Sequence, residues 1–122
     1  MFKQLKVYTL AFDLAMEIFQ ISKSFPKEEK YSITDQIRRS SRSVCANVGE
    51  GYRKRQYPAH FVNKLSDSDM ENTETQVWID FAYKCGYIKT QEYKLLLEKS
   101  ENIGMMLGYM ISKPEIFLPK PK

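Results

Sequence analysis

The sequence predicts an all-α protein that folds as an antiparallel up-down-up-down four-helix bundle. Prolines and a glycine divide its 122 residues into four segments of helical length, joined by short connections. Within the segments, apolar residues recur at steps of three and four, which is the period of a helix face. The sequence has neither sustained apolar-polar alternation nor an Asn-Gly or Asp-Gly hairpin turn. Short connections make consecutive helices antiparallel neighbours.

The first helix is expected from about Lys6 to Ser24, because Phe25-Pro26 disfavours helical geometry beyond it. Its main apolar stripe consists of Val7, Ala11, Leu14, Ile18, Ile21 and Phe25. A second apolar flank makes this face wider than a helix of a lone small bundle requires. Two interpretations stay open: a wide core face, or a face that is partly a subunit interface. The second flank consists of Leu10, Phe12, Ala15, Met16 and Phe19.

The second helix is expected from Ile33 to about Gln56, with Ser32 as its N-cap and Asp35 as a capping-box-like acid. Large and small residues alternate along its apolar stripe, and small residues allow a neighbouring backbone to approach closely. The segment carries six basic residues against two acidic ones. The stripe consists of Ile33, Ile37, Ser41, Val44, Val48 and Tyr52.

The third helix is expected from Pro58, which suits a first helical turn, to about Cys85. From Tyr57 to Ile88 the chain has five acidic residues against two lysines, so the second and third helices have opposite charge. If they are neighbours, the arginines from Arg38 to Arg42 would pair with carboxylates of the third helix, and such pairs set register. The expected carboxylates are Glu71 and Glu74.

The fourth helix is expected after Gly86, which suits the position following a helix, and it begins with Thr90 as its cap. Residues 1–113 are expected to form the bundle domain. The Pro/Lys-rich tail, residues 114–122, is expected to be extended or disordered because it has few apolar residues.

No residue pattern in the sequence supports catalysis or metal binding, so we expect no enzymatic activity, no metal and no cofactor. The single histidine, His60, has no nearby nucleophile and orienting acid. The acids from Asp67 to Glu71 resemble the start of a calcium loop, but Asn72 replaces the required glycine and Trp78 the closing glutamate. With only two cysteines and no apolar run long enough for a membrane, we expect a cytoplasmic protein.

Basic residues are the candidate binding groups, in a chain with a net charge of +4. Arg53, Lys54 and Arg55 close the second helix beside two tyrosines. They either complement the negative end of the helix dipole or form a phosphate-binding patch with aromatic rings for stacking. Further candidates are Arg38, Arg39 and Arg42.

Asn47 and Glu50 share a face of the second helix. They either form a helix-helix hydrogen bond and a salt bridge or contact a ligand. We favour the structural interpretation.

The string Gln36–Tyr52, QIRRSSRSVCANVGEGY, closely resembles that of bacterial four-helix bundle proteins encoded by intervening sequences of 23S ribosomal RNA. The resemblance extends over about Leu5 to Met110 and includes Phe25–Ile33, Glu74-Thr75-Gln76 and Gly86-Tyr87-Ile88. Within the string, we treat Asn47, Glu50, Gly51 and Tyr52 as a structural signature, together with Glu71 and Glu74 of the third helix.

This resemblance implies an antiparallel bundle that assembles as a barrel-like homopentamer. Similar proteins are the accessory variability determinants of diversity-generating retroelements, which associate with a reverse transcriptase and nucleic acid through a basic surface. The resemblance therefore favours a non-enzymatic oligomer that binds RNA or DNA, as the basic residues do. The alternative is a scaffold that docks a protein partner without nucleic acid.

Overall fold

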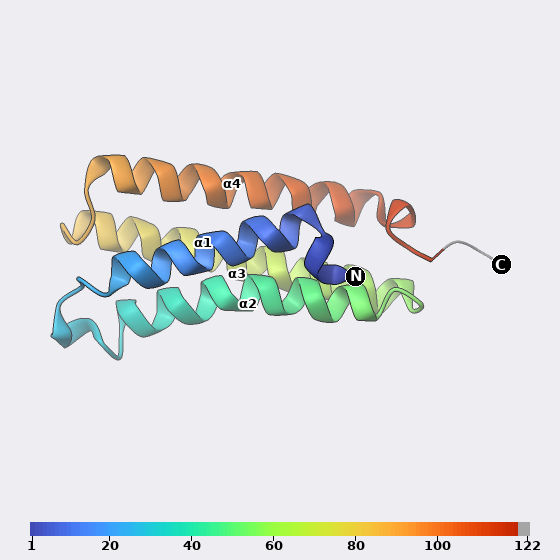
Figure 1. Cartoon of the computed structure of the whole chain (residues 1–122), viewed down its shortest axis with the longest axis horizontal. Coiled ribbons are helices and arrows are strands. Elements are labelled where there is room, and N and C mark those ends of the chain that lie inside the picture. The colour runs from blue at the N-terminus through green and yellow to red at the C-terminus, as the bar shows by residue number, and fades with distance from the viewer. Residues whose placement is uncertain (120–122) are drawn as a thin grey trace.

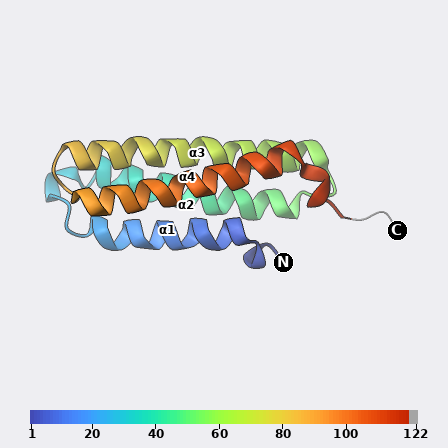
Figure 2. The same cartoon turned by 90° about the horizontal axis from the view of Figure 1, so that it is seen from above.

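The computed structural model describes residues 1–119, which form four α-helices and no strand. The helices are α1 (Lys6–Ser22), α2 (Ile33–Arg53), α3 (Pro58–Lys84) and α4 (Thr90–Ser112). Short 3-10 turns lie at Phe2–Gln4 (η1), Lys27–Glu29 (η2) and Pro114–Ile116 (η3). Consecutive helices run antiparallel along the length of the molecule (Figure 1). Seen from above, α1 and α3 lie on opposite sides of the bundle (Figure 2), so the predicted helix arrangement is confirmed.

The helix ends differ from the expected ones by up to three residues, and neither predicted cap residue forms a capping hydrogen bond through its side chain. Ser32 occupies the N-cap position of α2, but its hydroxyl donates to Glu29 Oε1 at 2.7 Å instead of capping the helix. The N-cap of α4 is Lys89, whose backbone N–H donates to Glu92 Oε1 at 2.8 Å. The predicted Thr90 cap is therefore wrong, because Thr90 is already the first helical residue.

The core combines large apolar side chains with a buried polar layer. Ser68 Oγ donates to the Val44 carbonyl at 2.8 Å, which joins α3 to α2. Asn72 joins α3 to α4 through two hydrogen bonds, at 2.9 and 2.8 Å, with the carbonyl and hydroxyl of Ser100. These directional bonds penalise a shifted helix register, because a shift would leave buried polar groups unpaired. The fully buried apolar side chains include Ile18, Ile37, Val48, Phe61, Leu65, Ile79, Leu96, Ile103 and Leu107.

The C-terminal tail is ordered as far as the structure describes it. Residues Pro114–Ile116 form a 3-10 turn, and Phe117 packs edge-on against Tyr109 with ring centroids 6.4 Å apart. The expectation of an extended or disordered tail is therefore wrong for residues 114–118, because Phe117 and Leu118 pack against the apolar core. The last three residues of the predicted tail, 120–122, lie outside the described residues.

Gly86 follows α3 with φ = 79°, as predicted for the residue after a helix. Tyr87 N–H then donates to the Ala82 carbonyl at 2.9 Å, which ends the helix. Among residues 1–119, none of the helices has the length and apolar character needed to cross a membrane.

Candidate nucleic-acid interface

The candidate basic residues form two groups on α2. Arg38, Arg39 and Arg42 belong to its N-terminal half, and Arg53 to Arg55 lie at its C-terminal end. Arg53 follows Arg42 by eleven positions, which corresponds to about 16 Å along the helix axis. The two groups of basic residues therefore form two separate surfaces, and each contacts different side chains.

In the C-terminal group, Arg55 is held by the fold itself. Its guanidinium carbon lies 3.6 Å from the centroid of the Tyr52 ring. Its Nε donates to the Tyr52 carbonyl at 2.9 Å, and its Nη1 donates to the Phe117 carbonyl at 3.2 Å. Arg55 thus joins the end of α2 to the C-terminal tail. Only Arg53 and Lys54 of this group are exposed to solvent.

In the N-terminal group, three cations surround the Phe19 ring of α1. The charged groups of Lys23, Arg38 and Arg42 lie 4.8, 4.8 and 5.7 Å from its centroid. Arg38 is also anchored to α1, because its Nε donates to Ser22 Oγ at 2.8 Å. The aromatic ring attracts each cation and holds the group together despite mutual repulsion. Lys23 was not predicted, because only the packing of α1 on α2 brings it here.

The predicted pairing of these arginines with Glu71 and Glu74 is wrong. Arg39 pairs instead with Asp35, one turn earlier on α2, at 3.1 Å. Within residues 1–119, none of the ion pairs includes Glu71 or Glu74. Burial raises the pKa of Glu71, and the neighbouring carboxylates of Glu74 and Asp67 raise it further. Of the three arginines, Arg38 and Arg42 thus have no carboxylate partner in the ion pairs of residues 1–119.

A hollow of about 550 Å³ opens on this basic surface, from the loop before α2 to the fourth turn of the helix. Four of its lining residues carry positive charge, and Asp35 alone carries negative charge. Its members on α2 recur at steps of three and four, so helical periodicity could have identified them. Lys30 and Tyr31 precede the helix and carried no such signal. The lining consists of Lys30, Tyr31, Thr34, Asp35, Arg38, Arg39, Arg42, Ser43 and Ala46.

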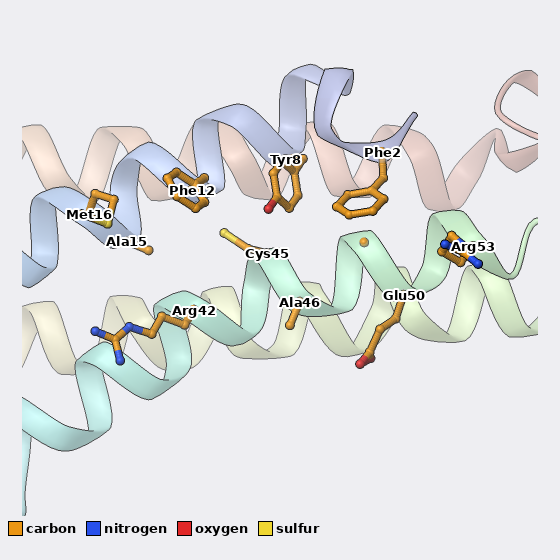
Figure 3. A pocket seen from close by; sticks show the side chains of 11 residues that line it. Phe2, Tyr8, Phe12, Ala15, Met16, Arg42, Cys45, Ala46, Glu50 and Arg53 are labelled. Atoms are coloured by element: carbon orange, nitrogen blue, oxygen red, sulfur yellow. The ribbon is translucent and has the colours of Figure 1, made fainter.

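A second hollow, of about 570 Å³, lies between α1 and α2 and is mostly apolar. Figure 3 shows its aromatic side chains reaching from α1 and η1 toward α2. Phe12 and Met16 remain 48% and 45% exposed here, so α1 has more apolar surface than the bundle covers. Arg42 and Arg53 contribute positive charge to the rim, whereas Glu50 is paired with Lys64 of α3 at 3.1 Å. We call this hollow the α1–α2 groove.

The signature residues have structural contacts in the bundle. The salt bridge predicted for Glu50 is confirmed by its pairing with Lys64. Asn47 was expected to form a hydrogen bond between two helices, and this expectation is wrong. Its Nδ2 donates to the Ser43 carbonyl of its own helix at 3.0 Å. Gly51 lies against α3, where an added Cβ would stand 2.9 Å from Lys64 Cβ. Tyr52 carries the Arg55 guanidinium on its ring.

The single histidine lies on the surface, whereas Cys45 is buried. His60 is exposed, and its ring packs edge-on against Tyr57 with centroids 5.9 Å apart. Burial raises the pKa of the Cys45 thiol to about 11, so this cysteine is a protonated core side chain at neutral pH. In the described part of the chain, no three potential metal ligands come together.

Comparison with known proteins assigns the chain to a protein family. The family model described as "23S rRNA-intervening sequence protein" matches residues 3–109. The chain belongs to the 23S rRNA-intervening sequence protein family. That match includes all of α1, α2 and α3 and most of α4, so the family resemblance predicted from Gln36–Tyr52 is confirmed.

One solved structure shows the same fold. It is the crystal structure of a protein of unknown function from the S23 ribosomal protein family of Bacteroides thetaiotaomicron VPI-5482. The two chains are 29% identical, with a TM-score of 0.80 over 87% of this chain and 95% of the other. No curated protein matches the chain.

Proposed function

We propose that this member of the 23S rRNA-intervening sequence protein family is a non-enzymatic, cytoplasmic homo-oligomer that binds RNA or DNA. The observation that carries the proposal is the cluster of cations at the α1–α2 junction. Lys23, Arg38 and Arg42 meet at one aromatic ring, and no carboxylate of residues 1–119 forms an ion pair with them. Concentrated positive charge of this kind attracts phosphate backbones through the release of counterions.

The N-terminal group is the better candidate surface of the two. All three of its arginines line one open hollow, and Arg39 and Arg42 are exposed. Arg38 is held by contacts with Ser22 and Phe19, as Arg55 of the C-terminal group is by contacts with Tyr52 and Phe117. Arg38 and Arg42 stand one helical turn apart, about 6 Å along the axis, so that neighbouring phosphates of one strand can reach both. Arg53 and Lys54, which are exposed at the other end of α2, form a separate, secondary contact surface.

The salt dependence of RNA binding tests this function. Binding of a fluorescein-labelled RNA hairpin is measured by anisotropy from 50 to about 300 mM salt. Each phosphate contact contributes about 0.7–0.9 to the slope of log affinity against log salt. Arg39→Gln and Arg42→Gln should therefore each reduce the slope by nearly one. Lys94→Gln, at an exposed position of α4, is the control with the same loss of charge.

Unchanged slopes in both arginine variants would show that this surface does not contact phosphate. If the wild-type protein binds no nucleic acid even at 50 mM salt, the proposed function itself is wrong. A reduced slope in Arg53→Gln and Lys54→Gln alone would move the interface to the C-terminal group.

Self-association is the second part of the proposal, and the resemblance implies a pentamer. The α1–α2 groove exposes Phe12 and Met16 and has arginines on its rim. α3 lies on the opposite side of the bundle from α1 (Figure 2). Its exposed residues include an apolar stripe with acids beside it. The α1–α2 groove of one copy and the α3 stripe of another are thus both apolar and carry opposite charges. This favours a head-to-tail contact between different faces of successive copies, and such contacts can close a ring. The stripe consists of Met70, Val77 and Phe81, and the acids are Asp67 and Glu74.

Light scattering on two single variants tests the head-to-tail contact. Phe12→Asp alters the groove and Phe81→Asp alters the α3 stripe, so each variant alone should be monomeric. An equimolar mixture should form heterodimers, because one intact groove then meets one intact stripe. Met105→Asp, in a separate apolar hollow between α1 and α4, is the control and should leave the oligomer intact. A mixture that stays monomeric, or a monomeric wild-type protein, would refute the contact.

The α1–α2 groove also favours the scaffold as a second candidate function. An apolar groove with arginines on its rim fits an amphipathic helix with acidic flanks from another protein. The resemblance to accessory variability determinants makes a reverse transcriptase the partner class to test. A stable complex that survives nuclease treatment and is lost in Phe12→Asp, with no RNA binding by the free protein, would favour this function over the first.

A further inference from the structure

Tyr31 is the most exposed large apolar side chain of the described residues, at 83%. Phe25 of the same connection and Ile33, the first residue of α2, are buried, so the core is closed without this ring. No other aromatic ring within residues 1–119 packs against it. Lys30 Nζ lies 5.4 Å from its centroid. The connection thus presents an aromatic ring to solvent beside a positive charge.

The ring stands at one end of the basic hollow on α2. The hollow has a volume of about 550 Å³, within the range of small-ligand sites. The positive side chains of Arg38, Arg39 and Arg42 line it beyond Tyr31. Its one carboxylate, Asp35, is paired with Arg39 at 3.1 Å and so repels a phosphate less than a free acid would. The hollow therefore has the aromatic ring of Tyr31 at one end and the three arginines along its length.

We propose that this hollow binds single-stranded RNA, with one unpaired base stacked on Tyr31 and the adjoining phosphates on Arg38, Arg39 and Arg42. The inference rests on the proposed nucleic-acid function and names its ligand class. Bases in a duplex are already stacked on each other, so an exposed side-chain ring can stack only on an unpaired base. Cations that follow the backbone, combined with an aromatic platform, are the usual means of binding single strands without sequence preference.

Stacking and phosphate contacts respond differently to salt, and the test uses this difference. The probes are a labelled oligouridine of twelve nucleotides and a labelled RNA duplex of equal length. Wild-type protein should bind the single strand more tightly than the duplex. Because stacking contributes a roughly 5- to 150-fold gain in affinity per base, Tyr31→Ala should weaken single-strand binding within that range. Its salt slope should stay unchanged, since no phosphate contact is lost. Tyr31→Phe should retain the wild-type affinity.

Tyr57→Ala is the matched control, because Tyr57 is an exposed tyrosine beside the C-terminal basic group. Its affinity for the single strand should equal that of the wild-type protein. Equal binding of duplex and single strand, with Tyr31→Ala unaffected, would overturn the inference while leaving the proposed function intact. A loss of affinity in Tyr57→Ala alone would overturn it as well, by placing the stacked base at the other end of α2. Absence of binding to both probes would refute the inference and the proposed function together.

Discussion

Arg55 provides a sharp test of the division between structural and ligand-binding cations. Replacement by alanine removes a cation-π contact with Tyr52, worth about 0.5–1 kcal/mol, and the hydrogen bond to Phe117, worth about 1 kcal/mol at a half-exposed position. The Arg55→Ala protein should thus lose roughly 2 kcal/mol of its free energy of unfolding. For a domain of this size, that loss lowers the melting temperature by about 6–10 °C.

The loss is measured by circular dichroism during thermal unfolding, with Lys54→Ala as the control. Lys54 is exposed, so its replacement should change stability by no more than about 0.5 kcal/mol. Arg55→Lys keeps the charge but loses the planar stacking group, and should show most of the destabilisation. RNA binding by Arg55→Ala should keep the wild-type salt slope. An unchanged melting temperature together with a reduced salt slope would refute this interpretation, because Arg55 would then contact phosphate instead of the tail.

Further predictions concern the packing of α2 on α3 and the pH dependence of one loop. Gly51→Ala should destabilise the fold by about 1–3 kcal/mol in chemical denaturation, because its Cβ would lie 2.9 Å from Lys64 Cβ. Gly108→Ala, with open space around the added Cβ, should stabilise the fold by about 0.5–1 kcal/mol. The reverse order of stabilities would contradict the packing of α2 on α3. Tyr87 donates to Glu29 Oε2 at 2.6 Å, and this bond raises the pKa of Tyr87 to about 12 and lowers that of Glu29. The tyrosine's contribution to stability should be complete below pH 10 and lost as the pH rises through about 12; that of Glu29 is complete above its ordinary pKa of 4.5 and lost as the pH falls through the lowered value. Tyr87→Phe should return the pKa of Glu29 toward 4.5 in an NMR titration, and an unchanged pKa would show that the bond does not form in solution.

The fold was largely predictable because its signals are local. Pro26, Pro58 and Gly86 interrupt helices whatever the tertiary structure is. A stripe such as Val7, Ala11 and Leu14 likewise defines a helix face without reference to other helices. The helix caps were less predictable, since the Ser32 hydroxyl can bond either to the first backbone N–H groups of α2 or to the Glu29 carboxylate. Its hydroxyl bonds Glu29, three residues earlier, instead of the helix that it precedes. That choice depends on the exact path of the connection.

The candidate site was predictable only in part. Arg38, Arg39 and Arg42 could be named from charge and spacing, but their expected carboxylate partners were wrong. Opposite net charges on α2 and α3 do not fix which side chains face each other, and α3 turned Ser68 and Thr75 toward α2. The hollow itself joins helix residues to Tyr31 of the preceding connection, which no periodic pattern includes.

By itself, the sequence determined the helices, their antiparallel order, the family and the basic character of α2. Each of these depends on residues a few positions apart or on a recognisable string. Only the tertiary structure decided which cations belong to the fold and which face solvent. Lys23, the residue that follows α1, reaches the arginines of α2 across Phe19, and Arg55 is bound to a carbonyl 62 positions away. Such contacts arise from the packing of distant segments, for which the period of a helix carries no information.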